Sequence, residues 1–262
     1  MRGETRKKDP AVTQRDIRDG LDRLGTGTGS AGMVHSSLSS FGTVDGGALG
    51  VIKALMQQVS GKGTILMPAF VQKVNGRRAS YPERETEWNI ETSPSDVGLV
   101  TETFRTTTSV IRSDHPSHSI CTWGRNAKEA TRGHRTASGR PSPWCNRAFG
   151  VGSPWDWMYE NDVHYLLMGV DFNVCTMLHY VQALFAERNG LYEGNLQQWP
   201  IFSFPAVGEK LKEKDIVDET TVGRSRWYHL GAKSLVDEAL GILEGNPEMI
   251  KPTRIAPYLS EE

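Results

Sequence analysis

The stretch Gly169-Val-Asp-Phe-Asn-Val-Cys-Thr-Met-Leu-His-Tyr-Val-Gln182 directly follows an apolar run, Tyr165-Leu-Leu-Met168. The run predicts a buried strand that ends at Gly169, and the residues after the short polar turn predict a helix. That helix places His179 and Gln182 three residues apart on one face. α/β proteins tend to keep their chemistry at such a place, just beyond the end of a strand. The stretch therefore predicts an α/β fold with a functional site at this strand end.

The rest of the chain alternates strand and helix patterns, as α/β proteins do. Thr13 predicts one helix N-cap, and Ser93 followed by Pro94 predicts another. Strands are expected at 32–36, 64–67, 109–112, 119–123 and 163–168, and helices at 13–25, 49–59, 93–104, 126–134, 176–188 and 236–243. We find no internal repeat and no linker, so we expect a disordered tail at residues 1–12 and one domain over residues 13–262.

Two segments interrupt this alternation. Residues 71–92 are polar and long for a loop, and loops of this length are usually lids or binding loops. Residues 136–154 are rich in Gly, Pro and Ser, and we expect them to be irregular.

Composition and charge exclude several classes of protein. The 262 residues include 30 Lys+Arg and 31 Asp+Glu, so we expect no basic face for nucleic acid. No apolar run approaches the ~18 residues of a membrane span, and the charged N-terminus is unlike a signal peptide. The cysteines Cys121, Cys145 and Cys175 are too few and too irregularly spaced for a disulfide framework. We therefore expect a cytoplasmic protein without nucleic-acid or membrane partners.

A second informative segment runs from Met33 to Gly47, between an expected strand and an expected helix. It is dense in Ser, Gly and Thr, and small residues let backbone N–H groups approach a ligand closely. The N-terminus of the following helix favours a carbonyl oxygen or a phosphate there. From composition alone, a simple Ser/Gly-rich turn explains this segment equally well.

The segment resembles the N-terminal signature of the aminoglycoside 3-N-acetyltransferase (antibiotic N-acetyltransferase) family. The similarity continues in order through Val51–Leu55, Gly63–Phe70, Ser95–Gly98, Arg112–Ser119, Gly152–Pro154 and Gly169–His179. It covers roughly residues 13–190, whereas the C-terminal third matches only loosely.

The resemblance implies a layered α/β sandwich with a mixed central sheet. It also implies transfer of an acetyl group from acetyl-coenzyme A to an amine of an amino sugar, with His179 as general base and His35 near the thioester. The implied coenzyme site, which needs no metal, consists of His35, Ser36, Ser37, Leu38, Ser39, Phe41, Gly42, Val44 and Ser119.

The chemistry of such a reaction independently requires these groups. An amine that attacks a thioester must lose a proton, and a histidine with a pKa near ~6.5 can accept it. The developing oxyanion needs hydrogen-bond donors, which the backbone around Ser36–Ser39 or the Thr176 hydroxyl can supply. Both substrates can be held together for direct attack, so we expect no covalent acyl-enzyme.

One position departs from the family pattern. The pattern usually carries a glutamate three residues after the histidine, and this chain has Gln182. Glutamine accepts a hydrogen bond but has no charge to favour imidazolium. Either the base is weaker here, or the acceptor is less cationic than an aminoglycoside, and we favour the second explanation. Asp171, Glu187 and His118 are also expected to face the acceptor, with much of that site formed by residues 71–92 and the C-terminal third.

The sequence leaves other functions open. The same chemistry can serve biosynthesis, on a nucleotide-linked amino sugar or a natural-product amine. A zinc hydrolase would use His115, His118 and Cys121, although strand geometry would direct these side chains to different faces. A non-catalytic module that binds coenzyme A is a third alternative, and a homodimer is left open.

Overall fold

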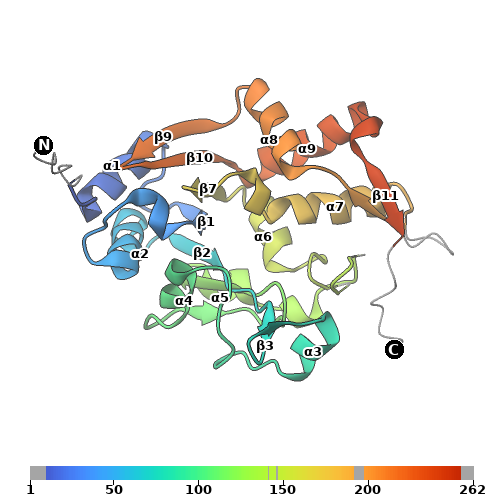
Figure 1. Ribbon diagram of the computed structural model, residues 1–262, viewed down its shortest axis with the longest axis horizontal. Helices are drawn as coiled ribbons and strands as arrows, with labels where there is room; N and C mark the ends of the chain where they lie inside the picture. Colours follow the sequence, from blue (N-terminus) through green and yellow to red (C-terminus); the bar gives the residue numbers. More distant parts are fainter. Residues whose placement is uncertain (1–9, 141, 146, 192–197, 255–262) are drawn as a thin grey trace, which may run out of the picture.

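The computed structural model describes residues 10–140, 142–145, 147–191 and 198–254 of the chain. Its centre is a seven-stranded mixed sheet with the strand order β5-β6-β2-β1-β7-β10-β9 (Figure 1). β1 is parallel to β2 and β7, and the outer pairs are antiparallel. These strands are β1 (Ala31–Ser36), β2 (Thr64–Pro68), β5 (Ile111–Arg112), β6 (Ile120–Gly124), β7 (His164–Met168), β9 (Asp218–Val222) and β10 (Ser225–Gly231).

Side chains alternate between the two faces of the sheet, and each face covers its own hydrophobic core. Met33 and Leu167 pack in one core, whereas Val34 and Leu166 pack in the other. This alternation follows from the two-residue period of a strand. Because both faces are covered, the central strands are mostly apolar along their length. Their apolar runs are the feature from which the sequence predicts these strands.

Helices cover both faces of the sheet. α1 (Gln14–Arg23), α2 (Gly47–Val59) and α4 (Leu99–Arg105) contribute to one core. The other core receives side chains from α5 (Ala127–Thr131), α6 (Pro154–Glu160), α7 (Met177–Arg188), α8 (Phe204–Glu213) and α9 (Ala232–Gly245). Figure 1 shows α1 and α2 towards the left of the molecule and α7, α8 and α9 towards the right. The layered α/β sandwich with a mixed central sheet is confirmed.

Shorter elements lie outside the main sheet. β3 (Lys73–Val74) pairs with β4 (Arg77–Arg78), and β8 (Gln198–Ile201) pairs with β11 (Lys251–Arg254). α3 (Tyr81–Thr86) follows β4, and 3-10 turns occur at η1 (Leu38–Phe41), η2 (His134–Thr136), η3 (Phe172–Val174) and η4 (Pro247–Met249).

The N-terminal helix begins where the sequence predicts. Thr13 Oγ1 accepts the N–H of Asp16 (3.2 Å), and the Asp16 carboxylate accepts the N–H of Thr13 (2.8 Å). This reciprocal pair is a capping box. Val12 was assigned to the disordered tail, but it is 4% exposed and forms a bridge with Val44. Residues 1–9 of that tail lie outside the described residues.

Residues 71–92 contain regular structure, where we expected a loop. They form the β3–β4 hairpin and α3. Asn75 and Gly76 have positive φ (50° and 78°) at the hairpin turn, as a two-residue primed turn requires. Ser80 and Glu83 form the capping box that starts α3.

The helix expected from Ser93 begins later, at Leu99. Ser93 Oγ instead accepts the N–H of Asn89 (3.0 Å), which closes a local turn. Gly98 has φ 135°, a conformation outside the helical region, so α4 starts only after it.

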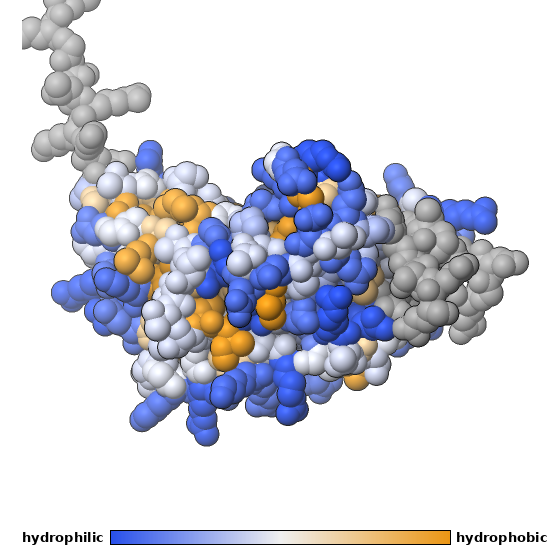
Figure 2. Space-filling view, turned by 90° about the horizontal axis from the view of Figure 1, so that it is seen from below, coloured by the Kyte–Doolittle hydropathy of each residue, from blue (hydrophilic) through white to orange (hydrophobic). Residues whose placement is uncertain are grey.

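Figure 2 shows the molecule from below, with apolar groups gathered towards the left, on the side where α1 and α2 lie. Leu49 of α2 and Leu99 of α4 are among the exposed large apolar side chains. Within the described ranges, none of the helices combines the length and the apolar composition needed to cross a membrane.

Candidate active site

A cavity of about 550 Å³ opens at one end of the central sheet. β2, β1 and β7 run parallel, so their carboxyl ends meet at this edge, which is where open α/β sheets bind ligands. β1 contributes His35 and Ser36 to the wall, and α7 contributes His179. The cavity therefore joins the two segments that the sequence singled out.

His179 lies on the first turn of α7, one turn before Gln182. His179 Nδ1 and Gln182 Oε1 are 2.6 Å apart, and Gln182 Nε2 donates to the carbonyl oxygen of Pro200 (2.6 Å). Because the amide nitrogen must face that carbonyl, the amide oxygen faces the imidazole. His179 therefore carries its hydrogen on Nδ1 and has the lone pair of Nε2 left for a ligand in the cavity.

Aromatic rings surround the His179 imidazole. The Trp144 ring meets it edge-on at 4.5 Å between centroids, and the Phe204 ring does so at 4.7 Å. Burial lowers the pKa of His179 to about 4, although the hydrogen bond with Gln182 opposes this shift. The ring is therefore neutral at pH 7, the state in which a base accepts a proton.

His35 lies near the carboxyl end of β1. Pairing with β7 places Met33 opposite Tyr165 and His35 opposite Leu167, so His35 and Tyr165 project from the same face. His35 Nε2 is 2.7 Å from Tyr165 Oη, and Tyr165 Oη accepts the N–H of Met177 (3.1 Å). The phenol oxygen accepts that N–H, and we assign its own hydrogen to the contact with His35 Nε2.

This contact fixes the tautomer of His35. Nε2 accepts a hydrogen bond, so the ring hydrogen is on Nδ1, the nitrogen left for a ligand. Burial lowers the pKa of His35 to about 3, which keeps the ring neutral. His35 is thus a hydrogen-bond donor, whereas His179 is an acceptor.

Hydroxyl groups also line the cavity, among them those of Ser36 and Thr176. Thr176 is the N-cap residue of α7. Ser36 Oγ is buried and has no hydrogen-bond partner among the described residues. Buried hydroxyls normally have a partner, so the Ser36 hydroxyl indicates a ligand that bonds there.

His118 is a third imidazole in the wall. Its Nδ1 lies 2.7 Å from Ser117 Oγ. Burial, followed by the charges of His179 and Arg84, lowers the pKa of His118 well below its usual value. His118 is therefore within electrostatic range of both the proposed base and Arg84.

The side chains of His115, His118 and Cys121 do not converge. The His115 ring stacks on His134 at 4.5 Å between centroids. Cys121 lies in the core on one face of the sheet, whereas the His118 ring packs against Phe149 of the opposite core. In the part of the chain that the structure describes, no three His, Cys, Asp or Glu side chains gather where they could hold a metal ion. The arrangement gives no support to a zinc hydrolase.

Most residues expected to hold the coenzyme are not among those that line this cavity. The lining contains His35 and Ser36 but not Ser37, Leu38, Ser39, Phe41, Gly42, Val44 or Ser119. After Ser36 the chain turns into η1, which directs Phe41 into the core, at 5.6 Å from the Trp227 ring. Ser119 Oγ donates to the carbonyl oxygen of Ala69 (2.7 Å), a structural contact.

Two residues expected to face the acceptor also lie outside the lining. Asp171 is exposed and caps η3 by accepting the N–H of Asn173 (2.8 Å). Glu187, in the last turn of α7, pairs with Arg140 (2.8 Å). Neither carboxylate replaces the negative charge that Gln182 lacks.

Known proteins share this fold and sequence pattern. A family described as "Aminoglycoside 3-N-acetyltransferase" matches residues 33–244, which is more than half of the chain. The chain belongs to the aminoglycoside 3-N-acetyltransferase family.

Two curated relatives show how far the similarity extends. The SPbeta prophage-derived aminoglycoside N(3')-acetyltransferase-like protein YokD of Bacillus subtilis (strain 168) is 32% identical over 184 residues, 65% of this chain and 64% of YokD. Aminoglycoside N(3)-acetyltransferase III of Salmonella sp is 29% identical over 206 residues, 75% of this chain and 66% of the relative. The match thus spans less than two thirds of either relative's length.

Solved structures show the aminoglycoside 3-N-acetyltransferase fold over most of the chain. The crystal structure of YokD from Bacillus subtilis is 25% identical with a TM-score of 0.73, covering 91% of this chain and 96% of that one. The structure of AAC-IIIb, a binary complex with CoASH, is 19% identical with a TM-score of 0.71, covering 93% and 100%.

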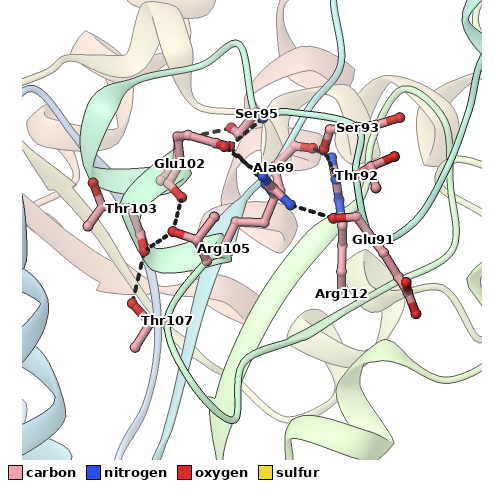
Figure 3. Close-up of polar contacts among 12 residues, drawn as sticks. Ala69, Glu91, Thr92, Ser93, Ser95, Glu102, Thr103, Arg105, Thr107 and Arg112 are labelled. Atoms are coloured by element: carbon pink, nitrogen blue, oxygen red, sulfur yellow. Dashed lines mark hydrogen bonds and ion pairs between the residues drawn. The ribbon is translucent and has the colours of Figure 1, made fainter.

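A buried arginine holds one side of the cavity of this aminoglycoside 3-N-acetyltransferase family member. Arg112 of β5 donates to the carbonyl oxygens of Ser93 and Ala69 (Figure 3). Figure 3 also shows that Arg105 of α4 donates to the carbonyl oxygen of Glu91 (2.7 Å). The two guanidinium groups therefore fix the segment that leads to residues 96 and 97 of the cavity wall.

Sequence reasoning missed several residues of the site. Tyr165 belongs to a strand that was predicted, but its contact with His35 depends on strand register. Trp144 lies in a segment without periodicity, so no sequence signal identified it. Arg78 and Arg84 also line the cavity, and the sequence shows them only as members of a polar segment.

Proposed function

We propose that this chain is a coenzyme A-dependent N-acyltransferase that acetylates an amine of an aminoglycoside or another amino sugar. The proposal rests on one observation: Nε2 of His179 and Nδ1–H of His35 are both left for ligands in one cavity. Family membership supports it, as do a relative named aminoglycoside N(3)-acetyltransferase III and a neighbour solved with CoASH.

The cavity residues fit the thioester end of acetyl-coenzyme A. The volume of about 550 Å³ lies within the ~300–1,000 Å³ typical of ligand pockets. His35 and Ser36 both line the cavity, and His35 Nδ1–H and the Ser36 hydroxyl, which has no partner among the described residues, are the donors that we assign to the thioester. Thr176 brings a further hydroxyl to the same wall.

When bound, acetyl-coenzyme A supplies an activated acetyl group, whose carbon–sulfur bond breaks as a carbon–nitrogen bond to the acceptor amine forms. His179 Nε2 takes the proton from the attacking amine and passes it to the leaving sulfur, so that the coenzyme departs as a free thiol. Gln182 holds Nδ1–H throughout and so keeps the Nε2 lone pair available. General-base help of this kind is typically worth ~10²–10⁴-fold in rate.

His35 and Ser36 act on the oxygen that gains negative charge during the transfer. Donors that are already oriented stabilise this charge without reorganisation, and removing one typically costs ~10²–10³-fold in kcat. Tyr165 is a positioning residue, because it acts on the reaction through His35.

An acceptor panel tests this function. Purified protein is mixed with acetyl-coenzyme A and, in turn, a kanamycin-like aminoglycoside, simple amino sugars and nucleotide-linked amino sugars, and free thiol is followed. We expect amine-dependent thiol release and an acetylated product, both lost in His179→Ala. The preferred amine separates antibiotic modification from biosynthesis. Coenzyme A binding without thiol release for any amine would contradict the proposal and indicate a non-catalytic binding module.

A further inference from the structure

Asp96 carries the one carboxylate among the described residues that line the cavity. Its Oδ2 atom holds the chain of the wall, since it accepts the backbone N–H groups of Gln72 (2.8 Å) and Lys73 (2.9 Å). Among the described residues, none donates a hydrogen bond to Oδ1 of Asp96 or forms an ion pair with this side chain. Because each carboxylate oxygen can accept hydrogen bonds, Asp96 has one oxygen left for a ligand.

The backbone around Asp96 is fixed, so its carboxylate has a defined place. The N–H of Asp96 donates to the carbonyl oxygen of Phe70 (2.9 Å). The N–H of the preceding residue, Ser95, donates to the carboxylate of Glu102 (2.7 Å), and Glu102 is also paired with Arg105 (2.6 Å; Figure 3). A side chain that is already held in position loses little entropy when it binds a ligand, which favours a strong contact.

Asp96 lies close to the chain that we expect to hold the thioester. Gly98, two residues further on, passes the carboxyl end of β1, because a Cβ added to it would lie 3.9 Å from the carbonyl oxygen of Ser36. Val97, between Asp96 and Gly98, lines the same cavity. Asp96 therefore belongs to the wall beside the proposed thioester site.

Aromatic rings lead along the wall from this segment to the proposed base. Phe70, whose carbonyl oxygen accepts the Asp96 N–H, lies 5.1 Å from the His118 ring, measured between centroids. The Trp144 ring meets His118 at 4.9 Å and His179 at 4.5 Å. All these residues line one cavity, so a ligand that fills it borders both Asp96 and His179.

The ligand group that suits a carboxylate oxygen is a cation, which forms a charge-assisted hydrogen bond with it. Coenzyme A carries phosphates, which a carboxylate repels, and its pantetheine arm has no cationic group. The acceptor is therefore the source of the cation. The amine that attacks the thioester must be uncharged, so the cation is a different amine of the same molecule.

We propose that Asp96 binds an ammonium group of the acceptor, separate from the amine that is acetylated. This proposal rests on the N-acyltransferase function above and defines its acceptor class as amino sugars that carry a second amine. Asp96 then supplies the negative charge that Gln182 lacks, at a different place in the cavity. It is a specificity-determining residue, because it contacts the acceptor and not the reacting atoms.

The nearby guanidinium of Arg84 does not occupy this oxygen. Arg84 donates to the carbonyl oxygen of Val71 (3.1 Å), and Asp96 accepts the N–H of Gln72 from the same peptide. This peptide is trans, and the C=O and N–H of a trans peptide point in opposite directions. Arg84 and Asp96 therefore approach it from opposite sides.

Asp96→Asn separates the charge of this side chain from its structural contacts. The amide oxygen of asparagine can still accept the N–H groups of Gln72 and Lys73, whereas the negative charge is lost. The probes are glucosamine and the two diamino sugars in which an amine replaces its 3-hydroxyl or its 6-hydroxyl. We expect wild-type kcat/KM to be at least ~10-fold higher for one of the diamines than for glucosamine.

The variant should lose most of this preference. Its kcat/KM for glucosamine and its KM for acetyl-coenzyme A should stay as in the wild type. Asp114→Asn is the matched control, because the Asp114 carboxylate accepts the indole N–H of Trp88 (2.7 Å) and does not line the cavity. It should keep the preference, and loss of the preference in both variants would refute the role of Asp96.

Two further kinetic outcomes would overturn the proposal. Equal wild-type kcat/KM for glucosamine and both diamines would do so while leaving N-acyl transfer intact, and this comparison needs no variant. A raised KM for acetyl-coenzyme A in Asp96→Asn, with unchanged acceptor preference, would assign Asp96 to an amide N–H of the pantetheine arm.

Calorimetry tests the subsite without catalysis. One of the diamines, titrated into wild-type protein saturated with coenzyme A, should bind at least ~10-fold more tightly than glucosamine, and Asp96→Asn should abolish this difference. Equal affinities of the three probes for the wild-type protein would refute the subsite, whether or not any amine is acetylated. Tighter diamine binding without thiol release would instead refute the N-acyltransferase function and leave the ammonium subsite in place.

Discussion

The end of β1 and the first turn of α7 each bring one imidazole to the same cavity, yet the two rings have opposite hydrogen-bonding roles. At β1, the Tyr165 hydroxyl donates to His35 Nε2 (2.7 Å) and leaves Nδ1–H for a ligand. At α7, Gln182 Oε1 accepts Nδ1–H of His179 (2.6 Å) and leaves the lone pair of Nε2.

The difference does not come from the rings themselves. Burial lowers the pKa of His35 to about 3 and that of His179 to about 4, so both rings are neutral at pH 7. The partner of each ring decides which nitrogen carries the hydrogen. A phenol makes one imidazole a donor, and a side-chain amide makes the other an acceptor.

Loss of the His179 ring, which accepts a hydrogen bond, should have the largest effect on kcat. We expect His179→Ala to lower kcat by at least ~100-fold, because the amine loses its general base, while coenzyme A affinity is nearly unchanged. Steady-state kinetics and calorimetric coenzyme A binding measure the two quantities. His164→Ala removes an imidazole outside the cavity wall and serves as the control. Wild-type activity in His179→Ala would remove the assignment of the base.

Loss of the Tyr165 hydroxyl, which donates to His35, should have a smaller effect on kcat. Tyr165→Phe leaves His35 without a partner that fixes its tautomer, and we expect kcat to fall about 10-fold with little change in KM. The variant also leaves the N–H of Met177 unpaired, which should lower the free energy of unfolding by about 1–3 kcal/mol.

Tyr180→Phe is the matched control for this substitution. It removes a hydroxyl that donates to Asp156 (2.7 Å), away from the cavity, and should lower stability without lowering kcat. Equal losses of kcat in Tyr165→Phe and Tyr180→Phe would show that the effect is structural and not one of positioning.

Changing the partner of His179 should have a still smaller effect. Gln182→Leu lets the ring adopt either tautomer, and we expect kcat to fall about three- to tenfold. Gln182→Glu keeps an acceptor and adds a negative charge, which stabilises imidazolium. The pH profile of kcat should then show its acid limb above the value near 4 expected for the wild-type base. An acid limb that is the same in both proteins would contradict this role of Gln182.

A histidine whose two ring nitrogens are both occupied should affect stability alone. His134 lies between Ser113 Oγ (2.9 Å from Nδ1) and the carbonyl oxygen of Ala148 (3.1 Å from Nε2). Burial lowers the pKa of His134 from 6.5 to about 4. Between these two pH values the unfolded chain binds a proton at His134 that the folded protein does not. The contribution of neutral His134 to the free energy of unfolding is therefore complete well above pH 6.5 and is lost as the pH falls towards 4.

The size of this loss can be measured. At pH 5.5 it should amount to about 1 kcal/mol. His134→Gln cannot titrate, so the difference in unfolding free energy between wild type and variant should shrink by that amount from pH 7.5 to pH 5.5 in denaturant titrations. A constant difference would show that His134 does not titrate in this way.

The fold was largely predictable where the signal is local. β7 and α7 were predicted from an apolar run and a turn, both of which lie within a few residues. The β3–β4 hairpin and α3 were missed although Asn75-Gly76 and the Ser80–Glu83 capping box are strong local signals. Residues 71–92 are highly charged, and high charge without an apolar periodicity predicts a loop, which is why these local signals were outweighed.

The candidate site was predictable only in part, because its hydrogen bonds join residues that are distant in sequence. The resemblance identified His35 and His179. The contact of His35 with Tyr165 requires the β1–β7 register, and the orientation of the Gln182 amide requires the carbonyl of Pro200. Neither Tyr165, the partner of His35, nor Pro200, the partner of Gln182, can be found from a motif. A local sequence pattern does not determine which strands or loops are neighbours in the fold.

The indole of Trp144 borders the cavity and meets the edge of the His179 ring. Indole fluorescence is quenched by a nearby protonated imidazole and shifts in colour when surrounding water is displaced. If His179 is the base we propose, emission from this side chain should fall when the ring accepts a proton and recover when the ring releases it. Stopped-flow fluorescence of the unlabelled protein is therefore a direct test of proton transfer at His179.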